Sequence, residues 1–135
     1  MGFSAGGHVC ADLAARFAAP VYTPVDGFDA LSARPMLAAP IYPVVSMAEG
    51  VAHAGSRLQL LGASPSAAMI AAHSPDRTIP ADAPPHFLLH AEDDDAVPVE
   101  NTLLLRAALG EARGEGPSRA IASPVISPAL PEAFH

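Results

Sequence analysis

The 135-residue chain has fourteen acidic residues against seven arginines and no lysine, which gives a net charge of −7, and half of its residues are apolar. This length suits one ordinary domain, and the acidic balance argues against nucleic acid or an anionic membrane as a partner. No apolar run is long enough to span a bilayer and no secretory signal is present, so a cytoplasmic location is the default expectation.

The first predicted element is a helix. Val9, Leu13 and Phe17 recur at a spacing of four, with alanines widening the apolar stripe. This spacing predicts an amphipathic helix over residues 6–18, which Pro20 stops.

A loop and a strand are expected next. Residues 20–35 hold three prolines, a glycine and scattered polar groups, which is typical of a surface loop. Residues 36–47 are apolar and partly β-branched, as in a buried strand, with Pro40 and Pro43 at its ends or edge.

Two further helices and a second strand follow. Ser64 and Pro65 are a typical cap and first helical residue, and predict a helix over 66–73. Residues 85–91 are a short strand candidate, and residues 98–110 predict a helix that begins at a proline and ends at a glycine. Strands that alternate with helices favour an α/β fold with a parallel sheet.

The character of the chain changes from residue 110 onward. This segment contains four prolines and three glycines, and no apolar period persists. We therefore expect a domain over residues 1–109 and a largely irregular tail over residues 110–135.

The stretch Gly2-Phe3-Ser4-Ala5-Gly6 fits the pattern G-x-S-x-G. In this pattern a nucleophilic serine lies on a tight strand-to-helix turn, and the glycines on either side leave room for the backbone. The backbone N–H of Ala5, at the positive end of the next helix, would donate to the oxyanion of a tetrahedral intermediate. The structural alternative for Ser4 is a capping serine in a glycine-rich turn.

A nucleophilic serine needs a base, and the base needs an orienting carboxylate. Acidic residues 92–95 follow the strand candidate at 85–91, as a triad acid would, although such a run can also be a solvated loop. A metal site formed by His90 and residues 93–95 is disfavoured, because adjacent loop residues rarely converge on one ion. Cys10 is the single cysteine, which excludes an internal disulfide and a cysteine-based zinc cluster, and it is expected to be a small core residue.

Four stretches, GFSAGGH, RPMLAAPIYPVVSM, SRLQLLGASPS and HAEDDDAVPVEN, resemble in this order the acetyl-xylan-esterase-like and BD-FAE-type carboxylesterases of the α/β-hydrolase superfamily. The resemblance covers about residues 1–109. It implies a mostly parallel sheet with flanking helices and hydrolysis of acyl esters, often acetyl or aryl groups on carbohydrate, by Ser, His and Asp without a cofactor or metal. It places the nucleophile at Ser4 and the acid at Asp94, the second aspartate of H-x-x-D-D-x-x-V-P, with Asp95 as the fallback.

The sequence also departs from this family. The HGG-type oxyanion loop and several strands that precede the serine in the family are not found, nor is the G-H-G-F-like loop that carries the family histidine. His135 is the only histidine after the acid and is the candidate base. We therefore expect a partial α/β-hydrolase fold without its N-terminal strands, from a truncated or frame-shifted gene, whose exposed sheet edges would favour self-association. The alternative to an active enzyme is an inactive remnant of such an esterase.

The remaining histidines have structural explanations. His8, one turn into the first helix, is expected to pack or to form a local hydrogen bond rather than act as a base. His53, His73 and His86 are expected to face water. The assignment of the site requires that the serine and the acid lie at neighbouring strand ends, close enough for one imidazole to bridge them.

Overall fold

The computed structural model describes residues 1–114 and 124–127. In this part of the chain, parallel strands form a single sheet in the order β1-β2-β3-β4. The strands are β1 (Gly2–Phe3), β2 (Pro40–Ile41), β3 (Leu88–Ala91) and β4 (Pro124–Ser127). The α/β class with a parallel sheet, predicted from the alternation of elements, is confirmed.

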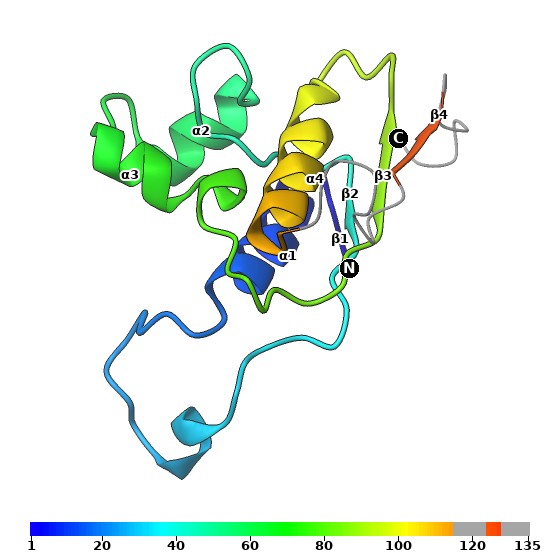
Figure 1. The fold of residues 1–135 in the computed structure, drawn as a ribbon. Helices are drawn as coiled ribbons and strands as arrows, with labels where there is room; N and C mark the ends of the chain where they lie inside the picture. Colours follow the sequence, from blue (N-terminus) through cyan, green and yellow to red (C-terminus); the bar gives the residue numbers. More distant parts are fainter. Residues whose placement is uncertain (115–123, 128–135) are drawn as a thin grey trace.

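The helices connect and cover these strands. They are α1 (Ser4–Arg16), α2 (Ala54–Leu61), α3 (Ala67–Ala72) and α4 (Glu100–Ala112), with short 3-10 turns at Gly27–Ala30 and Pro75–Arg77. Figure 1 shows α1 and α4 on the same side of the sheet, with α2 and α3 farther out. No helix of the described residues is long and apolar enough to cross a membrane.

Strand β2 is much shorter than the strand predicted over residues 36–47. Only Pro40 and Ile41 form it, with one isolated bridge between Ala38 and His86. A proline has no N–H to give to a sheet. After Ile41 the chain leaves the sheet at Tyr42, whose φ of +34° lies in the left-handed region.

In the buried segment that follows β2, side-chain oxygens accept hydrogen bonds from several backbone N–H groups. Asn101 Oδ1 accepts from the N–H groups of Val45 and Ser46 at 2.8 and 3.0 Å, and Ser74 Oγ accepts from the N–H of Met47 at 2.9 Å. A buried peptide N–H without a partner is destabilising. These polar side chains therefore allow an irregular segment to lie inside the fold.

Helix α1 does not bury the large residues of its predicted apolar stripe, although Ala14, which widens that stripe, is buried. Val9 and Leu13, in the predicted apolar stripe, are 66% and 47% exposed. The buried side carries small residues, among them Gly7, Ala11, Ala14 and Ala15. A Cβ at Gly7 would lie 2.9 Å from Cα of Pro43, so the helix approaches the segment after β2 too closely for large side chains.

Two apolar clusters hold the elements together. The first joins α1, β3 and α4 and contains Ala11, Val45, Ala83, Leu88, Leu105 and Leu109. The second joins the loops after β2 and β3 to α2 and contains Val44, Met47, Leu61 and Val97.

Several element boundaries differ from those predicted. Helix α2 was not expected; the ring of His53 caps it by accepting from the N–H of Ser56 at 3.2 Å. Helix α3 begins after Ser66, whose Oγ accepts from the N–H of Met69 at 3.2 Å, so the cap predicted at Ser64 is wrong.

The predicted end of the last helix needs correction, and a short strand lies within the predicted tail. Helix α4 continues through Gly110 to Ala112. Pro124–Ser127 forms β4, which pairs in parallel with β3. The division into a domain over 1–109 and a tail over 110–135 stays a prediction.

Candidate active site

Ser4 lies at the turn between β1 and α1. Its φ is +50°, in the left-handed region that residues with a side chain seldom adopt. A strained strand-to-helix turn that carries a serine is the geometry of a nucleophile elbow. The Ser4 hydroxyl makes no hydrogen bond to any residue that the structure describes.

The turn requires a glycine at position 2, but not at position 6, where the motif has its second glycine. A Cβ at Gly2 would lie 2.0 Å from the carbonyl oxygen of Gly6, so position 2 accepts only glycine. A Cβ at Gly6 would meet no described atom within 4 Å. The second close approach is instead at Gly7, which packs on Pro43. The expectation that Gly6 makes room for the backbone is therefore wrong for the described part of the chain.

The turn is fixed to the segment after β2. The N–H of Val44 donates to the carbonyl oxygen of Ser4 at 3.3 Å. His8 Nδ1 lies 3.1 Å from the carbonyl oxygen of Val44 and donates to it. Burial lowers the pKa of His8, against the opposing effect of Asp12. His8 is buried and hydrogen-bonded, as expected, although its partner lies 36 residues away rather than nearby.

Asp94 is held in the loop after β3. Its Oδ1 accepts from the N–H groups of Ala96 and Val97 at 2.9 and 2.8 Å. Its Oδ2 lies 3.5 Å from Nε2 of His90, and the side chain is 12% exposed. Asp95, the fallback acid, is exposed. Of the two aspartates, Asp94 therefore has the better-defined orientation.

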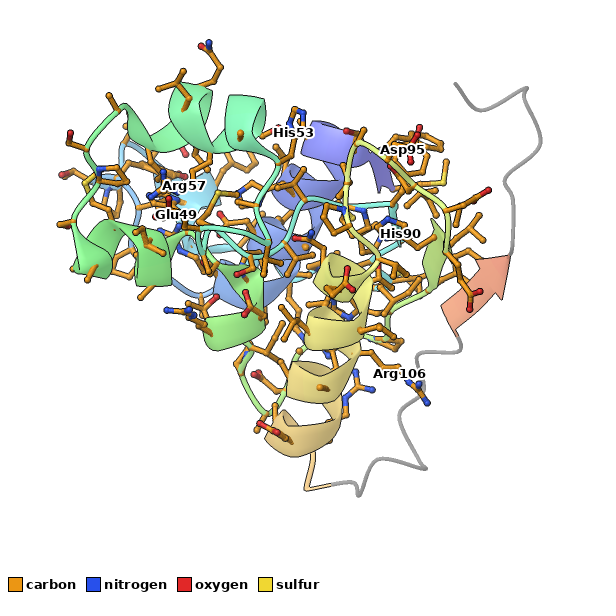
Figure 2. All side chains as sticks on the ribbon, turned by 90° about the horizontal axis from the view of Figure 1, so that it is seen from above. Glu49, His53, Arg57, His90, Asp95 and Arg106 are labelled. Atoms are coloured by element: carbon orange, nitrogen blue, oxygen red, sulfur yellow. The ribbon has the colours of Figure 1, made fainter. Side chains whose placement is uncertain are left out.

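His90 supports Asp94 from inside the fold. It belongs to β3, is fully buried, and lies beside the first turn of α4 (Figure 2). Thr102 Oγ1 donates to its Nδ1 at 2.7 Å, and its Nε2–H donates to the carbonyl oxygen of Val97 at 2.8 Å. Burial lowers the pKa of His90 more than the contacts with Val97 and Asp94 raise it, so the ring is neutral.

Both ring nitrogens of His90 are thus occupied by protein partners, which argues against a metal-ligand role. Among the described residues no group of three His, Cys, Asp or Glu side chains is placed to hold a metal ion. The role of His90 as a support was not recognised from the sequence. The available signal was a histidine inside an apolar strand, four residues before an aspartate.

Ser4 and Asp94 lie at the same edge of the sheet. They follow β1 and β3, which run parallel, so both are at the carboxyl ends of their strands. Strand β2 lies between β1 and β3, so the expectation of neighbouring strand ends is wrong. Two strand spacings correspond to about 9.6 Å. An imidazole that bridges the two groups therefore requires their loops to approach each other across the end of β2.

A cavity of about 480 Å³ lies beside this edge. Its lining includes Ala5, Val9, Met47, His53 and Leu60, from the first turns of α1, the segment before α2, and α2 itself. Figure 2 shows His53 near the beginning of α1. The N–H of Ala5 is in the first turn of α1, where a helix leaves its amide groups without intrahelical acceptors.

The other histidines are more buried than predicted. His53 and His73 are half-buried rather than facing water. His86 is only 3% exposed, and its Nδ1 donates to the carbonyl oxygen of Pro84 at 2.8 Å. The bridge to Ala38 brings His86 against β2, and burial lowers its pKa. Cys10 is half-buried. His135 lies outside the described residues.

Known hydrolases are similar to this chain in sequence and fold. No family model matches the sequence. The chain is similar to an acetyl ester-xyloside bifunctional hydrolase from Caldicellulosiruptor lactoaceticus, at 36% identity and a TM-score of 0.82, over 96% of this chain and 45% of that one. A thermophilic esterase from Thermogutta terrifontis, with propionate bound, gives 28% identity and a TM-score of 0.62, over 95% of this chain and 43% of that one.

A curated relative is also similar. Endo-1,4-beta-xylanase B from Butyrivibrio fibrisolvens is 36% identical over 118 residues, which are 84% of this chain and 18% of that protein. The chain therefore spans less than half the length of each of these relatives.

The parallel strands, the serine elbow and the flanking helices define a partial α/β-hydrolase fold. The solved structures to which the chain is similar in sequence are an acetyl ester-xyloside hydrolase and an esterase. The resemblance of its motifs to esterases of this superfamily is confirmed.

Proposed function

We propose that the chain carries the nucleophile and the acid of a serine hydrolase of the carboxylesterase type. The observation that supports this most strongly is the strained turn at Ser4, at the same sheet edge as a carboxylate that two backbone N–H groups orient. Acyl esters are the substrate class, and the name of the similar acetyl ester-xyloside bifunctional hydrolase supports acetyl esters on carbohydrate.

In this mechanism Ser4 Oγ attacks the ester carbonyl carbon, and its proton passes to a histidine that Asp94 orients. The N–H of Ala5 stabilises the oxyanion. The tetrahedral intermediate collapses as the C–O bond to the alcohol breaks, and the alcohol takes the proton from the histidine. Water, activated by the same base, then hydrolyses the acyl-serine. The base remains a prediction, with His135 as its candidate. No step needs a cofactor.

A second candidate is a chain that is inactive by itself and associates with other chains. The exposed side chains of Val9 and Leu13 on α1, next to β1 at the end of the described sheet, favour it. Edge strands and apolar surface of this kind promote association. A truncated or frame-shifted esterase would behave in this way.

The substitution Ser4→Ala tests the first candidate. After circular dichroism and sizing show a folded sample, we expect a fluorophosphonate probe to label the chain and an aryl acetate to be hydrolysed. Ser4→Ala should remove the labelling and lower kcat at least about a thousandfold, because triad members act as a unit.

Ser64→Ala serves as the control, because Ser64 is an exposed serine outside the site. It should leave both signals unchanged. Equal labelling of Ser4→Ala and the unsubstituted chain would rule out Ser4 as the nucleophile. A folded chain that shows neither signal would support the second candidate.

A further inference from the structure

The side chain of Asn101 joins two loops at the carboxyl edge of the sheet. It lies in the first turn of α4 and is completely buried. Its Oδ1 accepts two hydrogen bonds, from the N–H groups of Val45 and Ser46. Its Nδ2 donates two, to the carbonyl oxygens of Val51 at 2.9 Å and Pro98 at 3.0 Å. The carboxamide therefore uses its full hydrogen-bonding capacity.

The Oδ1 atom of Asn101 is connected through Val45 and Val44 to Ser4, the candidate nucleophile. Val45, which it holds, follows Val44 directly in the chain, and the N–H of Val44 donates to the carbonyl oxygen of Ser4. His8 also holds Val44, because its Nδ1 donates to the carbonyl oxygen of Val44. Asn101 therefore contacts the residue next to Val44, and Val44 contacts the turn that carries Ser4.

The Nδ2 atom of Asn101 is connected through Pro98 and Val97 to Asp94, the candidate acid. Pro98, which it holds, follows Val97, and the N–H of Val97 donates to Oδ1 of Asp94 at 2.8 Å. The carbonyl oxygen of Val97 accepts from His90, the neighbour of Asp94 Oδ2. Asn101 therefore contacts the residue next to Val97, and Val97 contacts Asp94, the candidate acid.

We propose that Asn101 is a positioning residue, whose carboxamide sets the separation between the Ser4 turn and the Asp94 loop. The inference rests on the proposed function for the importance of these two groups. Ser4 and Asp94 follow strands that β2 separates, so no direct strand pairing fixes their spacing. Asn101 supplies the missing connection across the end of β2. A displacement of about 1 Å between reacting groups can lower a rate by about a hundredfold.

Asparagine suits this role because it both accepts and donates. Asn101→Asp keeps the shape and an acceptor for Val45 and Ser46, but it places an oxygen against the carbonyl oxygens of Val51 and Pro98. The substitution should therefore weaken the attachment of Asn101 to Pro98 in the acid loop, and also to Val51 in the segment after β2. Should this variant not fold, Asn101→Ser takes its place, because serine is uncharged and too short to reach both loops.

Ser74→Ala is the matched control. Ser74 is also fully buried and also holds an N–H of the segment after β2, that of Met47, but its hydroxyl donates to Ile70 in α3. Removing it loosens the same segment without touching the acid loop.

The experiment measures two properties of the full chain. The first is the rate of Ser4 labelling by a fluorophosphonate, with kcat and KM for an aryl acetate. The second, independent of catalysis, is the set of NMR signals of the Val97 amide and the His90 ring. With Asn101→Asp we expect labelling and kcat to fall at least tenfold, KM to stay within about twofold, and both sets of signals to shift. With Ser74→Ala these quantities should stay near those of the unsubstituted chain.

The outcomes separate this inference from the proposed function. If the unsubstituted chain is not labelled, the proposed activity fails for this chain, and the NMR signals still decide the role of Asn101. The inference is overturned if Asn101→Asp leaves the Val97 and His90 signals where Ser74→Ala leaves them. It is equally overturned if the two variants lose labelling to the same extent.

Discussion

At the scale of single residues, the site depends on one strained backbone position and on the space around it. Ser4 adopts a positive φ, and the neighbouring peptides hold it there through Val44 and the close packing of Gly7 on Pro43. Strain of this kind persists only where the surrounding structure fixes it. The glycine that tolerates least change is Gly2, because its missing Cβ would overlap the backbone of the following helix.

A pair of substitutions tests this difference between the two motif glycines. Gly2→Ala should lower the free energy of unfolding by about 3 kcal/mol or more, because the clash is with backbone that cannot move aside. Gly6→Ala should leave it unchanged or raise it by about 0.5 kcal/mol, since alanine favours a helix and the space is open. Urea unfolding followed by circular dichroism measures both. Equal losses for the two variants would contradict the described geometry of the turn.

At the scale of elements, helix starts do much of the positioning. The first turn of α4 presents Asn101 to the loops after β2 and β3 and Thr102 to His90 of β3, and the beginning of α1 carries Ser4 and Ala5. Caps define the smaller helices: His53 caps α2 and Ser66 caps α3. The cap of α3 matters because this helix supports Ser74 through the carbonyl oxygen of Ile70.

The position of the α3 cap can be tested directly. Ser66→Ala removes an acceptor for the N–H of Met69 and should lower the free energy of unfolding by about 1 kcal/mol. Ser64→Ala, at the position favoured by the sequence, should change it by less than about 0.5 kcal/mol. Thermal unfolding of both variants under the same conditions provides the comparison. A larger loss for Ser64→Ala would restore the original assignment.

At the scale of the whole molecule, the described helices α1 and α4 lie on one side of the sheet (Figure 1), and α1 carries an exposed apolar surface next to β1. The described part of α1 buries small residues and exposes Val9 and Leu13. Parallel sheets are ordinarily covered on both faces. We expect the exposed apolar surface of α1 to favour contact with another copy of the chain.

We expect this surface to determine the association state of the chain. Val9→Glu should raise the fraction of monomer in sedimentation experiments, because a charge there opposes burial of the surface. Val25→Glu makes the same change at a residue that is 87% exposed in the loop after α1, and should have little effect. If both variants sediment like the unsubstituted chain, α1 is not the surface through which copies associate.

The sequence by itself determined the features that depend on local chemistry and order. The glycines and serine of residues 2–6 predicted the strand-to-helix turn, and the alternation of elements predicted the parallel sheet. The apolar stretch at 85–91 predicted β3 because a buried strand in a parallel sheet is apolar throughout. These features need no knowledge of distant residues.

Only the tertiary structure decided which surfaces are buried and which groups meet. The spacing of Val9 and Leu13 predicted a helix, but the close approach of Pro43 turned the small residues of that helix inward. Sequence could not place β2 between the strands of Ser4 and Asp94, nor bring Asn101 to segments 50 or more residues away. The physical reason is that burial and long-range hydrogen bonds depend on how the strands are ordered in space, which no local pattern records.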